Sequence, residues 1–108
     1  HYPPHNIEKI GADDYRITIA VAGFSEKDIN IVFNGDTLSV TGDRQEKTPS
    51  EETEILYQGI AARSFDRNFR LADHVKVIDA DLKNGLLTIF LKRELPEEKK
   101  PRFIKIKH

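Results

Sequence analysis

Apolar and polar residues alternate with a period of two along most of this chain. The alternation covers residues 15–21, 29–33, 38–40 and 87–91, which are rich in β-branched and aromatic residues. Such a period places successive side chains on opposite faces of a β-strand, and these residue types suit that conformation. Residues 25–29 could form one helical turn, but no amphipathic helix of useful length is indicated. We therefore expect an all-β fold.

Short turns separate the predicted strands. Asn34-Gly35-Asp36 and Asn84-Gly85 each join two alternating runs. Asparagine and glycine readily adopt the positive φ angles that tight hairpins need. A chain of 108 residues has room for one ordinary domain. Short strands at this spacing, separated by glycine-containing turns, predict an antiparallel β-sandwich.

The composition argues against several classes of partner. The chain carries 17 Lys and Arg against 18 Asp and Glu, and its net charge of -1 is unlike that of a nucleic-acid-binding domain. The longest apolar run, residues 19–22, is far shorter than the roughly 20 residues of a membrane-spanning helix. We expect neither nucleic acid nor membrane as a partner. The lack of cysteine favours a cytoplasmic location. Since methionine is also absent, we expect an N-terminal segment before His1 in the natural chain.

The sequence holds no recognisable catalytic or metal-binding pattern. The histidines His1, His5, His74 and His108 do not stand at metal-ligand spacing from each other or from clustered carboxylates. Nucleotide-binding and nucleophile motifs are missing, and paired acids such as Asp13-Asp14 lie in predicted loops. We expect no enzyme activity, no metal and no cofactor.

Two segments interrupt the alternation. Residues 43–54 are polar and lead into a short apolar island, Ile55-Leu56-Tyr57, within a long connection. Long connections inside compact domains are usually functional or disordered. Residues 93–102 contain Pro96 and Pro101 among charged residues, which predicts an extended linker.

A strand-like island, residues 103–108, follows this linker. In an extended chain Ile104 and Ile106 share one face, and Lys105 and Lys107 share the other. So short a segment cannot fold alone, and a linker of about ten residues spans up to roughly 35 Å. We expect the island to dock on this domain or on a neighbouring subunit. The alternative is a frayed terminus or a local edge strand.

One arginine is predicted at an unusual position. Arg63, Phe65, Arg67 and Phe69 share a face by alternation. If the phenylalanines point into the core, Arg67 is carried to a partly desolvated place, where a guanidinium needs carboxylate or carbonyl partners. Either Arg67 crosses a subunit interface or a bulge turns it out to water.

An ordered set of short motifs resembles a known family. The motifs are Ala22-Gly23-Phe24, residues 38–42 (LSVTG), residues 57–65 (YQGIAARSF), residues 80–87 (ADLKNGLL) and Ile104-Lys105-Ile106. Together they cover nearly the whole chain, and they are similar to those of the small heat-shock proteins, most nearly the bacterial inclusion-body-binding type. One difference is Ala22, where the family usually has proline.

The resemblance implies an immunoglobulin-like sandwich, the α-crystallin domain, over residues 1–93, and a C-terminal extension over residues 94–108. Within the domain, the loop 43–62 would carry a strand that is exchanged between two subunits and pairs with residues 6–10 of the partner. The exchanged strand would consist of Ile55, Leu56, Tyr57 and Gln58, and Arg63 and Arg67 would lie at the same dimer interface.

The resemblance also implies that Ile104 and Ile106 dock into a groove between residues 28–34 and residues 75–82 of another subunit. The second of these segments is apolar on both faces, because its parity changes between Val77 and Ile78. One face would fill the core and the other would be covered. We predict that the groove is lined by Ile31, Phe33, Val75 and Val77, with the reverse parity as the alternative.

The function implied by the resemblance is that of a chaperone that works without ATP. Such a holdase binds unfolding clients under stress, prevents their aggregation and passes them to ATP-driven chaperones. It would assemble as homo-oligomers of strand-exchanged dimers. The alternative is a monomeric p23-like β-sandwich adaptor, a co-chaperone module that needs neither the island nor the tail.

Overall fold

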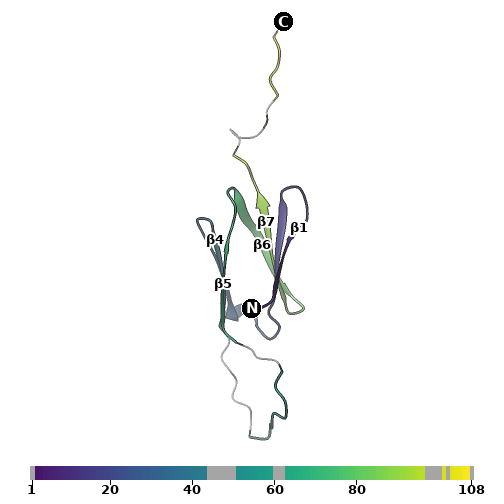
Figure 1. The fold of residues 1–108 in the computed structure, drawn as a ribbon, viewed down its shortest axis with the longest axis vertical. Coiled ribbons are helices and arrows are strands. Elements are labelled where there is room, and N and C mark those ends of the chain that lie inside the picture. Colours follow the sequence, from purple (N-terminus) through teal and green to yellow (C-terminus); the bar gives the residue numbers. More distant parts are fainter. Residues whose placement is uncertain (1, 44–50, 60–62, 97–100, 102, 108) are drawn as a thin grey trace.

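The computed structural model describes residues 2–43, 51–59, 63–96, 101 and 103–107. Within them the chain forms two antiparallel sheets that lie face to face (Figure 1). The larger sheet has the strand order β1–β2–β7–β6, and the smaller sheet has the order β3–β4–β5. The strands are β1 (His5–Lys9), β2 (Asp14–Ala20), β3 (Ile29–Asn34), β4 (Thr37–Gly42), β5 (Phe65–Arg70), β6 (Val75–Lys83) and β7 (Leu86–Arg93).

The core fills the space between the two sheets. It is built from one face of each alternating run, so that Ile17 and Ile19 of β2 meet Leu38 and Val40 of β4, with Ile89 of β7 beside them. Each of these side chains is 1% exposed or less, and burying one contributes roughly 1.5–3 kcal/mol. The predicted all-β, immunoglobulin-like sandwich is confirmed.

Both predicted hairpin turns are present. Gly35 has a φ of +66° between β3 and β4, and Asn84 and Gly85 have φ of +54° and +75° between β6 and β7. In the first turn the Asp36 carboxylate accepts hydrogen bonds from Thr37 and Arg70, which together hold the pKa of Asp36 below its ordinary value. A short 3-10 turn, η1 (Glu26–Asp28), lies where one helical turn was expected and leads into β3.

An aromatic cluster closes one end of the sandwich. The ring of Phe65 packs edge-on against Phe24 at 5.2 Å and against Tyr2 at 6.3 Å between centroids. Gly42, at the end of β4, lies directly beneath the Phe65 ring, where a Cβ would overlap the ring carbons. The close approach of this ring therefore requires glycine at position 42.

A β-bulge in β6 changes which residues face the core. Val77 pairs with Leu91, but the register shifts at Ile78, so that Ala80 pairs with Ile89 and Leu82 with Leu87. Because the extra residue resets the alternation, the bulge returns Ala80 and Leu82 to the inner face that Val77 also occupies. The expectation that Val77 lies on the opposite face from Ala80 and Leu82 is therefore wrong, and Ile78 itself is exposed.

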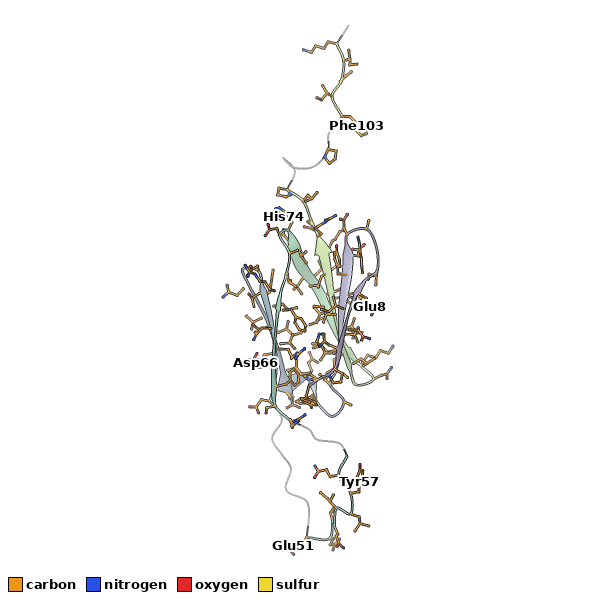
Figure 2. The ribbon with its side chains drawn as sticks, in the orientation of Figure 1. Glu8, Glu51, Tyr57, Asp66, His74 and Phe103 are labelled. Atoms are coloured by element: carbon orange, nitrogen blue, oxygen red, sulfur yellow. The ribbon has the colours of Figure 1, made fainter. Side chains whose placement is uncertain are left out.

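Two segments lie away from the sandwich at opposite ends of the molecule (Figure 2). Residues 51–59, with Tyr57, extend beyond one end, and residues 103–107 extend beyond the other. The molecule is therefore elongated, measuring 87 × 23 × 22 Å along its principal axes. The side chains of both segments are exposed in this single chain.

Candidate binding surfaces

The described residues include no group of three or more histidine, cysteine or acidic side chains that could hold a metal ion. None of the described helices is long and apolar enough to cross a membrane. The prominent features are instead apolar surfaces, and these lie at the edges of the two sheets and on the two projecting segments.

The first surface is a groove between the edge strands β3 and β6. It has a volume of about 360 Å³. Ile29 and Ile31 of β3 form one wall, and Ala80 and Leu82 of β6 form the other. Glu26, Asp81 and Leu87 complete the lining. An apolar groove beside an open strand edge can accept an extended chain, which gains both side-chain burial and backbone hydrogen bonds.

Of the four residues predicted to line this groove, only Ile31 does so. Val75 and Val77 lie on the far side of the bulge, where they pack against the core. Phe33 lies further along β3 and is 40% exposed. The bulge is the physical reason for the difference, since it brings Ala80 and Leu82 to the inner face. A tail-docking role for Ile31, Phe33, Val75 and Val77 stays a prediction.

Val75 instead lines a second apolar pocket on the opposite flank of the sandwich. This pocket, of about 460 Å³, lies between the β1–β2 side and β5 and includes Ile7, Phe69 and Leu71. Ile7 belongs to β1, which is the other edge of the larger sheet. Both flanks of the sandwich therefore combine an open strand edge with accessible apolar side chains.

The rim of the β3–β6 groove is acidic. Asp79 and Asp81 of β6 pair with Phe90 and Thr88 of β7, and Asp81 is among the residues that line the groove. The backbone N–H of Ala80 donates to Asp79 Oδ1 at 2.8 Å. Two carboxylates thus stand along the edge strand, one of them bound to an edge N–H group.

The C-terminal tail is anchored at its root. Arg93 donates to Asp13 Oδ1 at 2.9 Å, and Lys76 lies 3.6 Å from the Glu94 carboxylate. The Glu94 N–H also donates to the His74 carbonyl at 2.8 Å. These contacts hold the chain on the sandwich as far as Glu94.

Beyond its root the tail projects from the sandwich. Figure 2 shows Phe103 well away from both sheets. Ile104 and Ile106, predicted as the docking residues, are each 79% exposed. The isoleucines therefore remain available to another surface.

The predicted exchange segment is also exposed in the single chain. Leu56 and Tyr57 are almost fully exposed, Ile55 is about half exposed, and none of the residues 55–58 belongs to a strand. Among the described residues, β1, the strand expected to receive this segment, pairs with β2 along one edge and leaves its other edge open. The exchange itself stays a prediction.

The two arginines predicted at the dimer interface contact the N-terminal segment of the same chain. The Arg63 guanidinium lies 4.6 Å from the centroid of the Tyr2 ring. Arg67 is half-buried on the inner face of β5 and lies 2.9 Å from His5 Nδ1. An imidazole therefore takes the place of the expected carboxylate or carbonyl partner, and β5 has no bulge that turns Arg67 to water. The interface role of Arg63 and Arg67 stays a prediction.

Comparison with known proteins identifies the family. Residues 7–107 match the profile of the Hsp20/alpha crystallin family. The chain belongs to this family. Small heat shock protein HspD of Bradyrhizobium diazoefficiens is 47% identical over 106 residues, which are 98% of this chain and 68% of HspD. Small heat shock protein IbpA of Yersinia pestis is 49% identical over 106 residues, 98% of this chain and 76% of IbpA.

Solved structures of the Hsp20/alpha crystallin family have the same fold. A C-terminally truncated form of small heat shock protein AgsA from Salmonella typhimurium is 35% identical, with a TM-score of 0.79 over 98% of this chain and 100% of AgsA. A small heat-shock protein from Xylella fastidiosa reaches the same TM-score at 23% identity, over 100% and 98% of the two chains. The resemblance to small heat-shock proteins is thereby confirmed, and family membership supports a chaperone role in the stress response.

The sequence motifs were sufficient to identify the Hsp20/alpha crystallin family. They did not predict which polar residues lie around the apolar surfaces of this chain. His5, Glu26, Asp79 and Asp81 were missed. A signal for the last two was present, because acids alternate with Ala80 in an otherwise apolar strand. No sequence pattern predicted the contact of His5, because its partner Arg67 is 62 residues away along the chain.

Proposed function

We propose that this protein is an ATP-independent holdase that binds unfolding proteins and prevents their aggregation. It works by binding rather than by catalysis, and it assembles as homo-oligomers of strand-exchanged dimers. Residues 1–93 form the domain, and residues 94–108 form the extension that links dimers. The proposed site of action is the cytoplasm, which a cysteine-free chain suits.

One observation carries this proposal. In the described part of the chain, two apolar segments are exposed, around Leu56 and around Ile104, and open sheet edges with apolar surface beside them lie at β1 and on both sides of the β3–β6 groove. Exposed apolar segments and uncovered edges are unfavourable in an isolated soluble domain. When the segments of one copy pair with the sheet edges of another, the apolar side chains are buried and the unpaired backbone groups of the edges form hydrogen bonds.

The energetics favour contacts that form and release. Burying two isoleucine side chains is worth roughly 3–6 kcal/mol, and ordering the linker removes part of that gain. A single tail contact is therefore weak, with a dissociation constant of about millimolar order. Many such contacts hold an assembly together collectively while each remains exchangeable. Warming would release grooves and segments, which then bind the apolar surfaces of unfolding clients.

Aggregation of a heat-labile enzyme tests the proposed activity. The enzyme is warmed with and without the protein, in the absence of ATP, and light scattering is recorded. We expect the protein to suppress scattering at a near-equal molar ratio. Unchanged scattering at a several-fold molar excess of the protein would show that it is not a holdase. Adding an ATP-driven chaperone afterwards tests the proposed handover, which predicts recovery of enzyme activity.

A further inference from the structure

Backbone groups point out from the open edge of β6 at alternate residues. Residues 84–85 form a two-residue turn between β6 and β7, and Lys83 pairs with Leu86 across it. In such a hairpin the residues that flank the turn share backbone hydrogen bonds, and bonded and non-bonded pairs then alternate along the antiparallel ladder. The backbone groups of Asp79 and Asp81 therefore face β7, whereas those of Ala80 face the open edge.

The edge N–H group of Ala80 already has a partner within its own chain. It donates to Oδ1 of Asp79 at 2.8 Å, which is a short hydrogen bond to a charged acceptor. Because the bond joins adjacent residues, a rotation of the Asp79 side chain about its own χ angles is sufficient to form it or to break it. The Asp79 carboxylate therefore caps the open edge at Ala80.

The cap lies next to a second obstacle to strand addition. The β-bulge at Ile78 interrupts the register of β6 immediately before Asp79, and bulges on edge strands disturb the regular ladder that an incoming chain needs. Between the bulge and the turn after Lys83, a stretch that the structure describes in full, the N–H groups of Ala80 and Leu82 face the open edge. Since Ala80 is capped, Leu82 is the remaining donor there.

An open edge beside an apolar groove needs such protection. Ile29, Ile31 and Leu82 line the groove next to this edge, and an uncovered edge with apolar neighbours can pair with other chains without selectivity. A carboxylate on the Ala80 N–H makes each of these pairings less favourable, because the incoming strand must first displace it. The bond is exposed to water, so the displaced carboxylate is readily solvated. The cap therefore limits access to the edge without abolishing it.

We propose that Asp79 is an autoinhibitory cap on the edge of β6, which has to leave the Ala80 N–H before any strand can add at this position. The apparent affinity of an incoming strand is reduced by the fraction of molecules that are uncapped. A hydrogen bond of ordinary net strength lowers this affinity by about three- to tenfold. The inference goes beyond the proposed function, because it concerns how the edge is closed when no strand is bound to it.

Hydrogen exchange of the Ala80 amide tests the cap directly. It is measured by NMR in the 108-residue chain that carries Ile104→Ser and Ile106→Ser, so that no tail isoleucine can occupy the groove. In this parent, Asp79→Ala should accelerate the exchange of the Ala80 amide by about three- to tenfold after correction for intrinsic rates. Asp79→Asn keeps an Oδ1 acceptor and should restore most of the protection.

Asp81→Ala is the matched control for the loss of charge. It removes the same charge from the same strand, but the Ala80 N–H donates to Asp79 and not to Asp81. The exchange of the Ala80 amide should therefore stay at the rate of the parent. Equal rates in the parent and in Asp79→Ala would overturn the cap. Equal acceleration by Asp79→Ala and Asp81→Ala would assign the effect to charge and would overturn it too.

Assembly of the chain with an unsubstituted tail gives a second readout, which rests on the proposed docking of Ile104 and Ile106. Asp79→Ala should lower the protein concentration at which species larger than the dimer form by about three- to tenfold, and Asp81→Ala should not. Faster exchange with unchanged assembly of Asp79→Ala would overturn the autoinhibition. If no protein assembles beyond the dimer, the proposed tail docking fails, and the exchange of the Ala80 amide still decides whether Asp79 caps the edge.

Discussion

The guanidinium of Arg67 lies 2.9 Å from Nδ1 of His5 and joins β5 of the smaller sheet to β1 of the larger one. Because arginine can only donate, Nδ1 accepts the hydrogen bond and the ring carries its proton on Nε2. The His5 ring also packs edge-on against Phe69 at 5.3 Å between centroids. This contact holds the exposed edge strand β1 against the opposite sheet.

The contact predicts an energetic coupling between the two residues. We expect Arg67→Ala and His5→Ala to interact in a double-mutant cycle by about 1 kcal/mol in the free energy of unfolding, the usual net worth of one hydrogen bond. Urea unfolding of the four proteins measures it. Strictly additive effects would mean that the two side chains do not stabilise each other.

Gly42 is predicted to be intolerant of even a methyl group. Gly42→Ala should destabilise the domain by about 1–3 kcal/mol, because the new Cβ overlaps the Phe65 ring in a packed end of the core. Gly11→Ala is the matched control, since its Cβ would meet the side chain of Asp14, which can move. Thermal unfolding of both variants checks the difference. Equal melting temperatures would show that Phe65 is free to shift.

The exchange segment is predicted to affect association without affecting folding. Leu56→Ser with Tyr57→Ser should convert dimers to monomers, because these side chains are exposed in the single chain and would be buried only by a partner. Circular dichroism should stay unchanged. Val32→Ser, an exposed residue on β3, serves as the control and should leave the dimer intact. A dimer that survives the double substitution would remove the exchanged strand from the account.

A charge placed in the groove is predicted to prevent tail docking. Ala80→Lys puts a cation on the apolar wall at an exposed position, so assemblies larger than the dimer should dissociate while the fold remains. Ile78→Lys, on the same strand but outside the groove, should leave assembly unchanged. Sedimentation velocity measures both variants. Similar assembly sizes for the two would place the tail elsewhere.

The strands could be predicted from sequence because their pattern is local. Alternation identified the runs around Ile17, Leu38 and Ile89, and the turn at Asn84-Gly85 followed from backbone preferences alone. The groove lining could not be predicted in the same way. A period-two pattern does not reveal where a bulge inserts one residue, and the bulge at Ile78 decides whether Ala80 and Leu82 face the groove.

Contacts between segments that are distant along the chain also could not be predicted from the sequence. The unusual position of Arg67 was evident from its alternation with Phe65 and Phe69, but its partner depends on how β1 is placed against β5. The acidic rim could not be predicted either, because the sequence pattern does not show that Asp81 lies at the groove. Topology, rather than residue pattern, carries this information.

The mass of the protein in solution tests the central claim most directly. Native mass spectrometry of the 108-residue chain is compared with that of the same chain lacking residues 103–108. We predict dimers without the tail and species larger than dimers with it. Monomers in both samples would contradict strand exchange and tail docking together, and would favour a monomeric adaptor.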